Sequence, residues 1–344
     1  MYEKMIIEKK INREDVMKKI KWFLALCIFC MALAVTGCNT ANNADDKITI
    51  VCTNFPLYDW TRNLLGDNEA EVILLLNNGT DMHSFQPSAE EMVRIADCDM
   101  LVHVGGESDA WLLEALESTP NENRVVVNLM EVLEEDIRTE YYAEGMQTSH
   151  VHADGSVCEE GHEHTELLDE HIWLSLRLAV KACEAIEESL CGLLPESAEG
   201  ISVNADAYCK ELDSLDQRYT DMVADSSAES VVIVADRFPF LYMMEDYALE
   251  YCAAFPGCST EAEADFETVV FLAEEVEEHQ AEVLLITESG TMDLANTIFD
   301  NIEKDGDIAV LHSVQVVYQS DIDAGVSYLG YMEENLEVLK QVLQ

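Results

Sequence analysis

The sequence predicts an α/β protein of two lobes, each built on a four-stranded parallel sheet, with a long rigid helix joining them. Short apolar runs alternate with stretches of helical spacing, which is typical of parallel strands that helices cover on both faces. Four of the apolar runs lie before residue 130 and four lie after residue 230. The region between the two sets has no strand-like run and carries one amphipathic stripe.

The eight strand-like runs are short and mostly apolar, as buried parallel strands require. In chain order they are ITIVC (48–52), EVILLL (71–76), MLVHV (100–104), RVVVNL (124–129), VVIVA (231–235), LEYCAAF (249–255), VLLIT (283–287) and IAVLH (308–312). Helical stretches within each half are 59–66, 88–96, 109–117, 266–279, 291–302 and 324–343. We therefore expect lobes at residues 45–193 and 229–344.

A helix is predicted over residues 195–226, where apolar residues recur at steps of seven, four, three, four and three. These residues are Ile201, Tyr208, Leu212, Leu215, Tyr219 and Met222. At 1.5 Å per residue the helix would be about 45 Å long. A helix of this length between two lobes is a stiff spine, so we expect no large hinge closure.

The chain is strongly acidic, with 69 Asp and Glu against 19 Lys and Arg and a formal net charge of −50 at pH 7. Repulsion from phosphate therefore excludes nucleic acid as a partner. The cysteines form no repeated Cys-x-x-Cys pattern, and a chain of this length does not need disulfides to fold, so we predict no disulfide framework. Cys252 and Cys258, in YCAAFPGC, could still pair across a turn, and the sequence leaves their state open. We expect a monomer.

Residues 1–37 have the pattern of a secretory signal peptide, with Met17 as the expected start. KKIKWFLALCIFCMALAVTGC combines a basic beginning with fourteen apolar residues from Trp22 to Val35, too few for a bilayer core that needs about 20. Its end resembles a bacterial lipobox, in which cleavage leaves Cys38 as the lipidated first residue. We therefore expect an extracytoplasmic protein anchored to the membrane by a lipid on Cys38; the alternative is an uncleaved anchor helix.

Five side chains that can bind a metal follow predicted elements at the sheet edge where ligands bind. In parallel α/β sheets this edge lies beyond the carboxyl ends of the strands. His83 follows the second strand, His171 opens a helix after the fourth, Asp236 follows the fifth, Glu288 the seventh, and His312 ends the eighth. Because both halves of the chain contribute, we predict a metal site in the cleft between the lobes.

Three segments resemble the metal-specific solute-binding lipoproteins of ABC importers, the zinc and manganese group. They are NFPLYDWTRNLLGD, NGTDMHSFQPSAEEMVRIADCDMLVHVGG and, after a His-rich loop, DEHIWLSL. The resemblance covers residues 47–344. It implies two four-stranded α/β lobes joined by a long helix, with the ion between the lobes. It also implies that His83, in Asp-x-His-x-x-x-Pro, and His171, in Asp-x-His-x-Trp, are the first two metal ligands.

The second half departs from the pattern of that family. Where the family has its third ligand, a His or Glu, this chain has Arg237, whose guanidinium has no lone pair to donate. Where the family usually has an Asp after the last strand, this chain has His312. We therefore predict that His83, His171 and His312 hold the ion. Three imidazoles favour zinc over manganese, which prefers carboxylate and water.

The fourth ligand of this predicted site stays open. It is water, Asp236 or Glu288. Alternatively, Arg237 pairs with Glu288, so that this carboxylate lies next to the ligands without contacting the metal.

Residues 141–170 are rich in Gly, Glu, Asp and His and poor in apolar residues, which predicts a surface loop. The resemblance implies that this loop collects zinc weakly through His150, His152, His162 and His164. The alternative is a disordered loop with incidental histidines. His103, within a strand, and His279, on a charged helix face, are assigned to structure and solvent.

The leading prediction is a binding protein that captures zinc outside the cytoplasm and delivers it to the permease and ATPase of an ABC importer. One rival is a zinc-dependent surface enzyme, because three histidines and an open position also describe a catalytic zinc site. The chain has no His-Glu-x-x-His motif, and we predict no enzymatic activity. The other rival is a metal-binding adhesin or storage lipoprotein.

Overall fold

The computed structural model of the protein describes residues 47–68, 70–140, 142–147, 167–226, 230–259 and 263–343. These residues belong to one unit, Lys47–Gln344. The predicted signal peptide, the lipidation site Cys38 and the four loop histidines His150, His152, His162 and His164 lie outside the described residues.

The first sheet is parallel and has the strand order β2-β1-β3-β4. Its strands are β1 (Ile48–Cys52), β2 (Ala70–Leu74), β3 (Met100–His103) and β4 (Val125–Asn128). The helices of this part of the chain are α2 (Phe55–Leu65), α3 (Ala89–Asp97), α4 (Ala110–Ser118) and α5 (Leu129–Val132). Alternation of strand and helix is what makes parallel pairing possible, because each crossover needs a connection long enough to return the chain.

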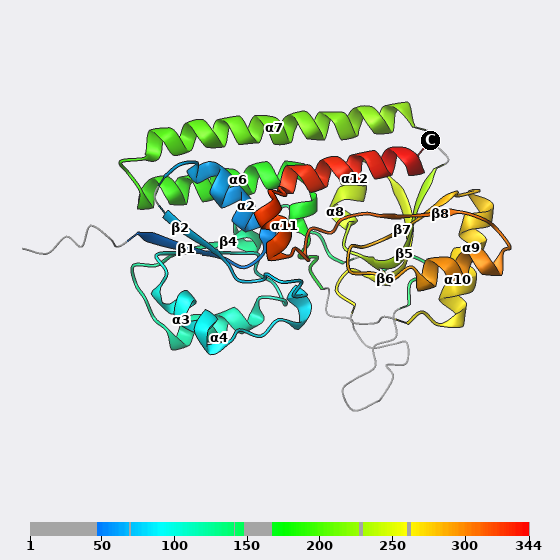
Figure 1. Ribbon diagram of the computed structural model, residues 1–344, viewed down its shortest axis with the longest axis horizontal. Coiled ribbons are helices and arrows are strands. Elements are labelled where there is room, and N and C mark those ends of the chain that lie inside the picture. The colour runs from blue at the N-terminus through cyan, green and yellow to red at the C-terminus, as the bar shows by residue number, and fades with distance from the viewer. Residues whose placement is uncertain are drawn as a thin grey trace, which may run out of the picture. The chain divides into compact units, whose positions relative to one another are not determined.

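The second sheet is also parallel and repeats the same order as β6-β5-β7-β8. Its strands are β5 (Val231–Phe238), β6 (Glu250–Pro256), β7 (Val283–Ile286) and β8 (Asp307–Val310), and its helices are α8 (Leu241–Asp246), α9 (Phe266–Glu278) and α10 (Asp293–Asn301). Each of the eight predicted strands is present, and the predicted fold class is confirmed (Figure 1). β5 continues past its predicted end to Phe238, with a shift of register between Val234 and Arg237.

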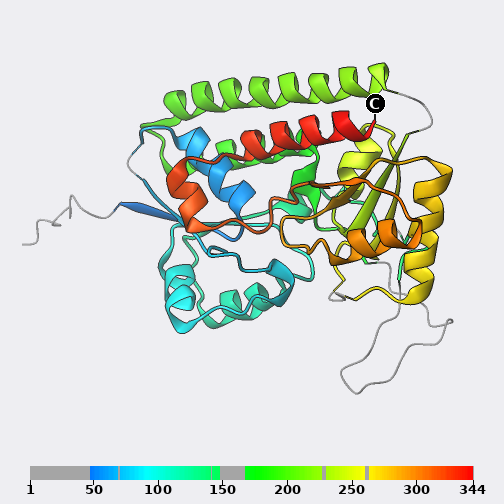
Figure 2. The ribbon, with the colours of Figure 1, turned by 45° about the vertical axis from the view of Figure 1, so that its right-hand side comes forward.

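Three long helices pack together beside the two sheets. They are α6 (Leu176–Leu193), α7 (Ala198–Asp225) and α12 (Tyr328–Val342). Figure 1 and Figure 2 show α7 running alongside α6 and α12, and α7 also packs on α2. The helix expected over 195–226 is thus observed as α7. Its six predicted stripe residues, Ile201, Tyr208, Leu212, Leu215, Tyr219 and Met222, are all buried.

One face of each sheet packs into a shared hydrophobic core, and the opposite faces pack into two smaller, separate cores. The shared core contains Ile50 of β1 and Val232 of β5, together with apolar side chains of α6, α7 and α12. Trp173 lies in this core and donates its Nε1–H to the carbonyl of Ser313 at 2.9 Å. The Tyr328 hydroxyl donates to the carbonyl of Trp173, so α12 is also hydrogen-bonded to this residue. A large hinge rotation would expose this apolar surface to water, so the shared core opposes it.

The last predicted helix, 324–343, is observed as α12, which begins four residues later, at Tyr328, and a separate short helix, α11, precedes it. α11 (Gln319–Ala324) ends at Gly325, which has a left-handed conformation with φ of 89°. α12 then begins after Ser327, whose hydroxyl accepts the N–H of Gly330 at 3.0 Å. Glycine at the end of one helix and serine at the start of the next are ordinary cap signals, and they separate the two helices.

In the part of the chain that the structure describes, no helix combines the length and the apolar character needed to cross a membrane.

Replacement of Leu212 by Ala should test the contribution of α7 to the shared core. Leu212 is fully buried, and Leu→Ala in a packed core costs about 2–5 kcal/mol of the free energy of unfolding. Val203 is 63% exposed on the same helix, so Val203→Ala should change that free energy by no more than about 0.5 kcal/mol. Denaturant unfolding of both variants measures the difference; equal effects would mean that α7 is not packed as described.

Candidate metal centre

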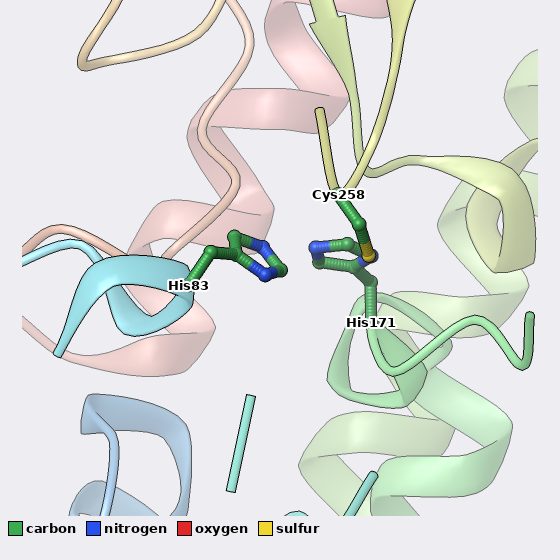
Figure 3. A group of neighbouring side chains, drawn as sticks. All are labelled: His83, His171 and Cys258. Atoms are coloured by element: carbon green, nitrogen blue, oxygen red, sulfur yellow. The ribbon is translucent and has the colours of Figure 1, made fainter. Parts of the chain in front are cut away.

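Three side chains from separate segments bring possible metal ligands together. His83 lies in the 3₁₀ turn η1 (Met82–Ser84), His171 precedes the 3₁₀ turn η2 (Ile172–Leu174), and Cys258 follows β6. Their ligand atoms all lie within 4.8 Å of one another. Figure 3 shows the His83 and His171 rings pointing toward each other, with the Cys258 sulfur beside His171. The site is formed by both halves of the chain.

The orientation of His83 follows from two hydrogen bonds. The backbone N–H of His83 donates to Oδ1 of Asp81 at 2.9 Å, which fixes the turn. The Ser108 hydroxyl lies 2.8 Å from Nδ1 of the ring. Nδ1 is thus engaged, and Nε2 is buried with no hydrogen-bond partner among the described residues.

His171 repeats this arrangement with a carboxylate. Oδ1 of Asp169 accepts from the backbone N–H of His171 at 2.8 Å and from its Nδ1 at 3.0 Å. A carboxylate on one ring nitrogen fixes the tautomer and makes the other nitrogen a better metal ligand. The ring is fully buried, and its Nε2 also has no partner among the described residues.

Two buried ring nitrogens without partners in one place favour a bound cation. Each such atom costs on the order of 1–3 kcal/mol when nothing satisfies it. The two ring centroids are 5.5 Å apart. A metal ion bound by both Nε2 atoms would satisfy both at once.

Cys258 is a free thiol, and so is Cys252, which answers the question that the sequence left open. Cys252 donates its thiol to Glu275, whereas the backbone N–H of Cys258 donates to Oε1 of Glu140 at 3.1 Å. Burial, and next the negative charge of Glu140, raise the pKa of the Cys258 thiol far above its ordinary value. Without a cation this thiol is therefore protonated.

The surroundings of His171 are acidic. Glu140, Asp169 and Glu170 are all buried. Burial alone would lower the pKa of His171, but the carboxylates, first of all Asp169, outweigh it and raise that pKa above 6.5. Burial and next the charge of His171 lower the pKa of His83 to about 4. The carboxylates give this buried group a field that favours a positive ion.

Close approach of the backbone at Gly257 lets Cys258 reach this group. A Cβ on Gly257 would lie 2.8 Å from the carbonyl oxygen of Phe238 and 3.0 Å from Cε1 of His171. Any other residue would therefore press on the ring of a candidate ligand.

His312 does not join the group, contrary to the prediction of a third histidine. Its Nε2 lies 3.3 Å from Glu334, and its ring packs on Tyr331 at 4.8 Å. The amide of Asn335 bonds both the N–H and the carbonyl of His312, at 2.7 and 2.8 Å. These contacts hold the segment after β8 against α12.

The two carboxylates considered for the fourth position accept hydrogen bonds from loop residues of their own lobe. They are Asp236 and Glu288. Asp236 accepts from the N–H and hydroxyl of Thr287 at 2.9 and 2.6 Å. Glu288 accepts from the N–H and hydroxyl of Ser313 at 2.8 and 2.7 Å. Neither belongs to the group of candidate ligands found among the described residues.

Arg237 pairs with Asp81 and not with Glu288, so that alternative is wrong. Its Nη1 lies 2.8 Å from Oδ2 of Asp81. A cavity of about 340 Å³ adjoins this pair, lined by Asp81, His83 and Ser84 of the first lobe and by residues of the second. The remaining lining residues are Ala235, Asp236, Arg237, Phe255, Ser289, Gly290, Thr291 and Leu294.

The two other histidines are placed as follows. His103 is buried at the end of β3, with Nδ1 3.3 Å from Asp109. His279 caps α9 and lies 3.5 Å from Glu275, with 26% of its side chain exposed.

Cys258 is not among the ligands predicted from the sequence. It follows β6 at the carboxyl edge of the second sheet, and the same strand-end rule that selected His83 would have selected it. The residue type alone gives no signal, because a free cysteine is often only a small buried side chain.

Two parallel four-stranded sheets on a shared core, with a buried metal-binding group supplied by both lobes, define the class of two-lobe metal-binding proteins. The sequence model of the family described as zinc-uptake complex component A, periplasmic, matches residues 50–342. The chain belongs to this family. The resemblance drawn from the His83 and His171 motifs is thereby confirmed.

Individual relatives agree with this membership. The zinc-binding lipoprotein AdcA of Streptococcus pneumoniae R6 is 32% identical over 326 residues, which are 94% of this chain and 61% of that protein. The chain thus spans about three fifths of that relative. The high-affinity zinc uptake system protein ZnuA of Bacillus subtilis 168 is 25% identical over 94% of this chain and 98% of its own length. The crystal structure of the Zn(II)-bound ZnuA-like domain of S. pneumoniae AdcA superposes with a TM-score of 0.67 at 27% identity, covering 86% of this chain and 99% of that domain.

The two candidate histidines should titrate far apart in the metal-free protein. His83 should stay neutral down to about pH 4, because burial and His171 oppose its charged form, whereas His171 should protonate above its ordinary 6.5. Titration of the ring carbon protons by NMR measures both. Asp169→Asn should lower the pKa of His171, since it removes the carboxylate on Nδ1. Two histidines that both titrate near 6.5 would show that the rings are neither buried nor coupled as described.

Proposed function

We propose that the protein captures a zinc ion outside the cytoplasm and delivers it to the permease and ATPase of an ABC importer. One observation carries the proposal: His83 and His171 each have a buried Nε2 without a hydrogen-bond partner among the described residues, and a ring nitrogen of each lies within 4.8 Å of the other and of the Cys258 thiol. Membership of a zinc-uptake family supports it, as do the zinc-binding names of the relatives.

The proposed ligands are Nε2 of His83, Nε2 of His171 and Sγ of Cys258, with Cys258 in place of His312. Zinc binds imidazole nitrogen and thiolate sulfur readily and prefers four ligands in tetrahedral geometry. The fourth position is then left for water. A thiolate favours zinc over manganese, whose preferred ligands are carboxylate and water.

The acidic surroundings fit the charge of this complex. A zinc ion bound by one thiolate and two neutral imidazoles carries a net charge of +1. Asp169, Glu170 and Glu140 lie buried around His171 and Cys258 and offset that charge. Burial of a charge is costly unless opposite charges or hydrogen bonds accompany it, so these carboxylates belong to the binding site.

Capture and delivery fit the structure better than catalysis. Both lobes supply proposed ligands, and the core shared by the two sheets packs beside them. The rival function as an enzyme requires that the protein turn over a substrate and that this turnover depend on zinc. The adhesin or storage rival requires no importer at all, and a zinc-uptake defect in cells without this chain would oppose it.

The remaining parts of the proposal concern segments outside the described residues. We propose that Cys38 carries the lipid that holds the protein at the outer face of the membrane. His150, His152, His162 and His164 are proposed to collect zinc weakly beside the tight site, and the protein is proposed to act as a monomer.

Removal of any one proposed ligand should weaken zinc binding strongly. His83→Ala, His171→Ala and Cys258→Ala should each cost roughly 3–5 kcal/mol, as when one partner of a buried charged pair is removed. His312→Ala is the matched control and should bind zinc like the parent. Competition with a chromophoric chelator measures all four. Cobalt(II) bound to the parent should also show a thiolate-to-metal charge-transfer band that Cys258→Ala lacks. If His312→Ala loses zinc and Cys258→Ala does not, the ligand set is wrong.

Zinc binding should release protons and weaken in acid. The raised pKa of Cys258 keeps its thiol protonated at neutral pH, so zinc must displace that proton. The apparent affinity should therefore rise about tenfold per pH unit above the pKa of His171 and more steeply below it, where His171 also loses a proton. His83 should contribute no proton above about pH 4. Calorimetry in buffers of different ionisation enthalpy counts the protons; a count in Cys258→Ala equal to that of the parent would exclude the thiolate.

A further inference from the structure

An ion pair joins the two lobes beside the proposed zinc site. Arg237 lies in β5 of the second lobe, just after the shift of register. Asp81 lies in the first lobe, directly before the turn that carries His83. The distance from Nη1 of Arg237 to Oδ2 of Asp81 is 2.8 Å, and the two side chains are only 23% and 28% exposed.

Asp81 uses its other oxygen to hold the proposed ligand. Oδ2 accepts from Arg237, while Oδ1 accepts the backbone N–H of His83 at 2.9 Å. One carboxylate therefore connects the guanidinium of the second lobe to the backbone of a ligand in the first. If the pair breaks, the turn at His83 loses this side-chain attachment to the second lobe, while the N–H of Gly79 still donates to the carbonyl of Val317 at 3.4 Å.

Arg237 is itself fixed at both ends within the second lobe. Its backbone N–H donates to Oδ1 of Asp236 at 2.8 Å, and its Nη2 donates to the hydroxyl of Ser289 at 3.1 Å. Thr287, at the start of the loop after β7, donates two hydrogen bonds to Oδ2 of Asp236. Asp236 and Arg237 are therefore both hydrogen-bonded to this loop. Arg237 thus presents a rigid cation to Asp81.

Among the three proposed ligands, His83 is the one with room to move. His171 is fully buried, and the backbone of Cys258 is held by Glu140. His83 is half-buried, and the cavity of about 340 Å³ lies against it. Departure of zinc is therefore easiest if the His83 turn moves into this space.

We propose that the Asp81–Arg237 ion pair is an interlobe latch that holds His83 in its coordinating position and slows the release of zinc. Arg237 acts as a positioning residue, because a guanidinium has no lone pair for a metal. The latch rests on the proposed function, since it assumes that His83 binds zinc.

The experiment measures the rate of zinc release from the full chain to excess chelator by stopped flow. Arg237→Met removes the cation, and Asp81→Asn removes the charge but keeps an oxygen that can accept the N–H of His83. Each should release zinc about tenfold faster, a factor equal to about 1.4 kcal/mol. The double variant should be no faster than either single variant, because residues that act as one pair are not additive.

Two further measurements separate a latch from a general structural role. Arg237→Lys keeps the charge and should recover part of the slow release. Release from the parent should accelerate with salt, which screens a partly exposed pair, and Arg237→Met should lose that dependence. Arg218→Met is the matched control, because Arg218 pairs with Glu333 on the exposed faces of α7 and α12. It should release zinc like the parent.

The outcomes decide the latch and the proposed function separately. Release rates of Arg237→Met and Asp81→Asn within twofold of the parent would overturn the latch, as would effects that multiply in the double variant. If Arg237→Met does not fold, Arg237→Lys and Asp81→Asn decide by the same criteria. The latch alone is lost if the parent binds zinc, its cobalt(II) form shows the thiolate band, and the variants release zinc like the parent. A parent that binds no zinc loses the proposed function as well.

Discussion

The burial of apolar surface in one core shared by both sheets is the constraint on which the rest of the structure depends. Trp173 connects this core to the proposed metal site. It is buried two residues after His171, and its Nε1–H donates a hydrogen bond to the carbonyl of Ser313 in the second lobe. Tyr328 bonds the carbonyl of Trp173 from α12. The proposed ligand His171 therefore cannot shift without disturbing the packing between the lobes. A site built in this way is positioned before any ion arrives, and such preorganisation reduces the entropy lost on binding.

Buried polar atoms without partners are rare in folded proteins because each destabilises the fold. At His83 and His171 the neighbouring hydroxyl and carboxylate engage Nδ1 of each ring, and neither Nε2 atom has a hydrogen-bond partner in the described part of the chain. The metal-free protein thus retains a local cost that an ion removes. The buried carboxylates around His171 favour a cation, and Cys258, as a proposed ligand, suits a metal that accepts sulfur.

The second lobe shows how a binding site can be rearranged within one fold. Arg237 stands where the resemblance places a ligand, and it bonds Asp81 instead of a metal. Cys258 reaches the site from the turn after β6, where Gly257 allows the backbone to pass close to His171. Arg237 lies in β5 and Cys258 lies just after β6, and these are neighbouring strands of the same sheet. The proposed site combines imidazole and thiolate ligands, and the Arg237 guanidinium stays outside the proposed coordination sphere.

The sequence by itself determined the eight strands, the stripe of α7 and the two histidines of the first lobe. These depend on local patterns: apolar runs, helical spacing, and aspartates two residues before each histidine that bond its backbone N–H. Only the tertiary structure placed Cys258, and not His312, beside these two histidines. Cys258 is held by Glu140, 118 positions away, and His312 is held by Asn335 on α12. Such contacts set the direction in which a loop leaves its strand, and no local pattern records them, because they exist only once distant segments have packed together.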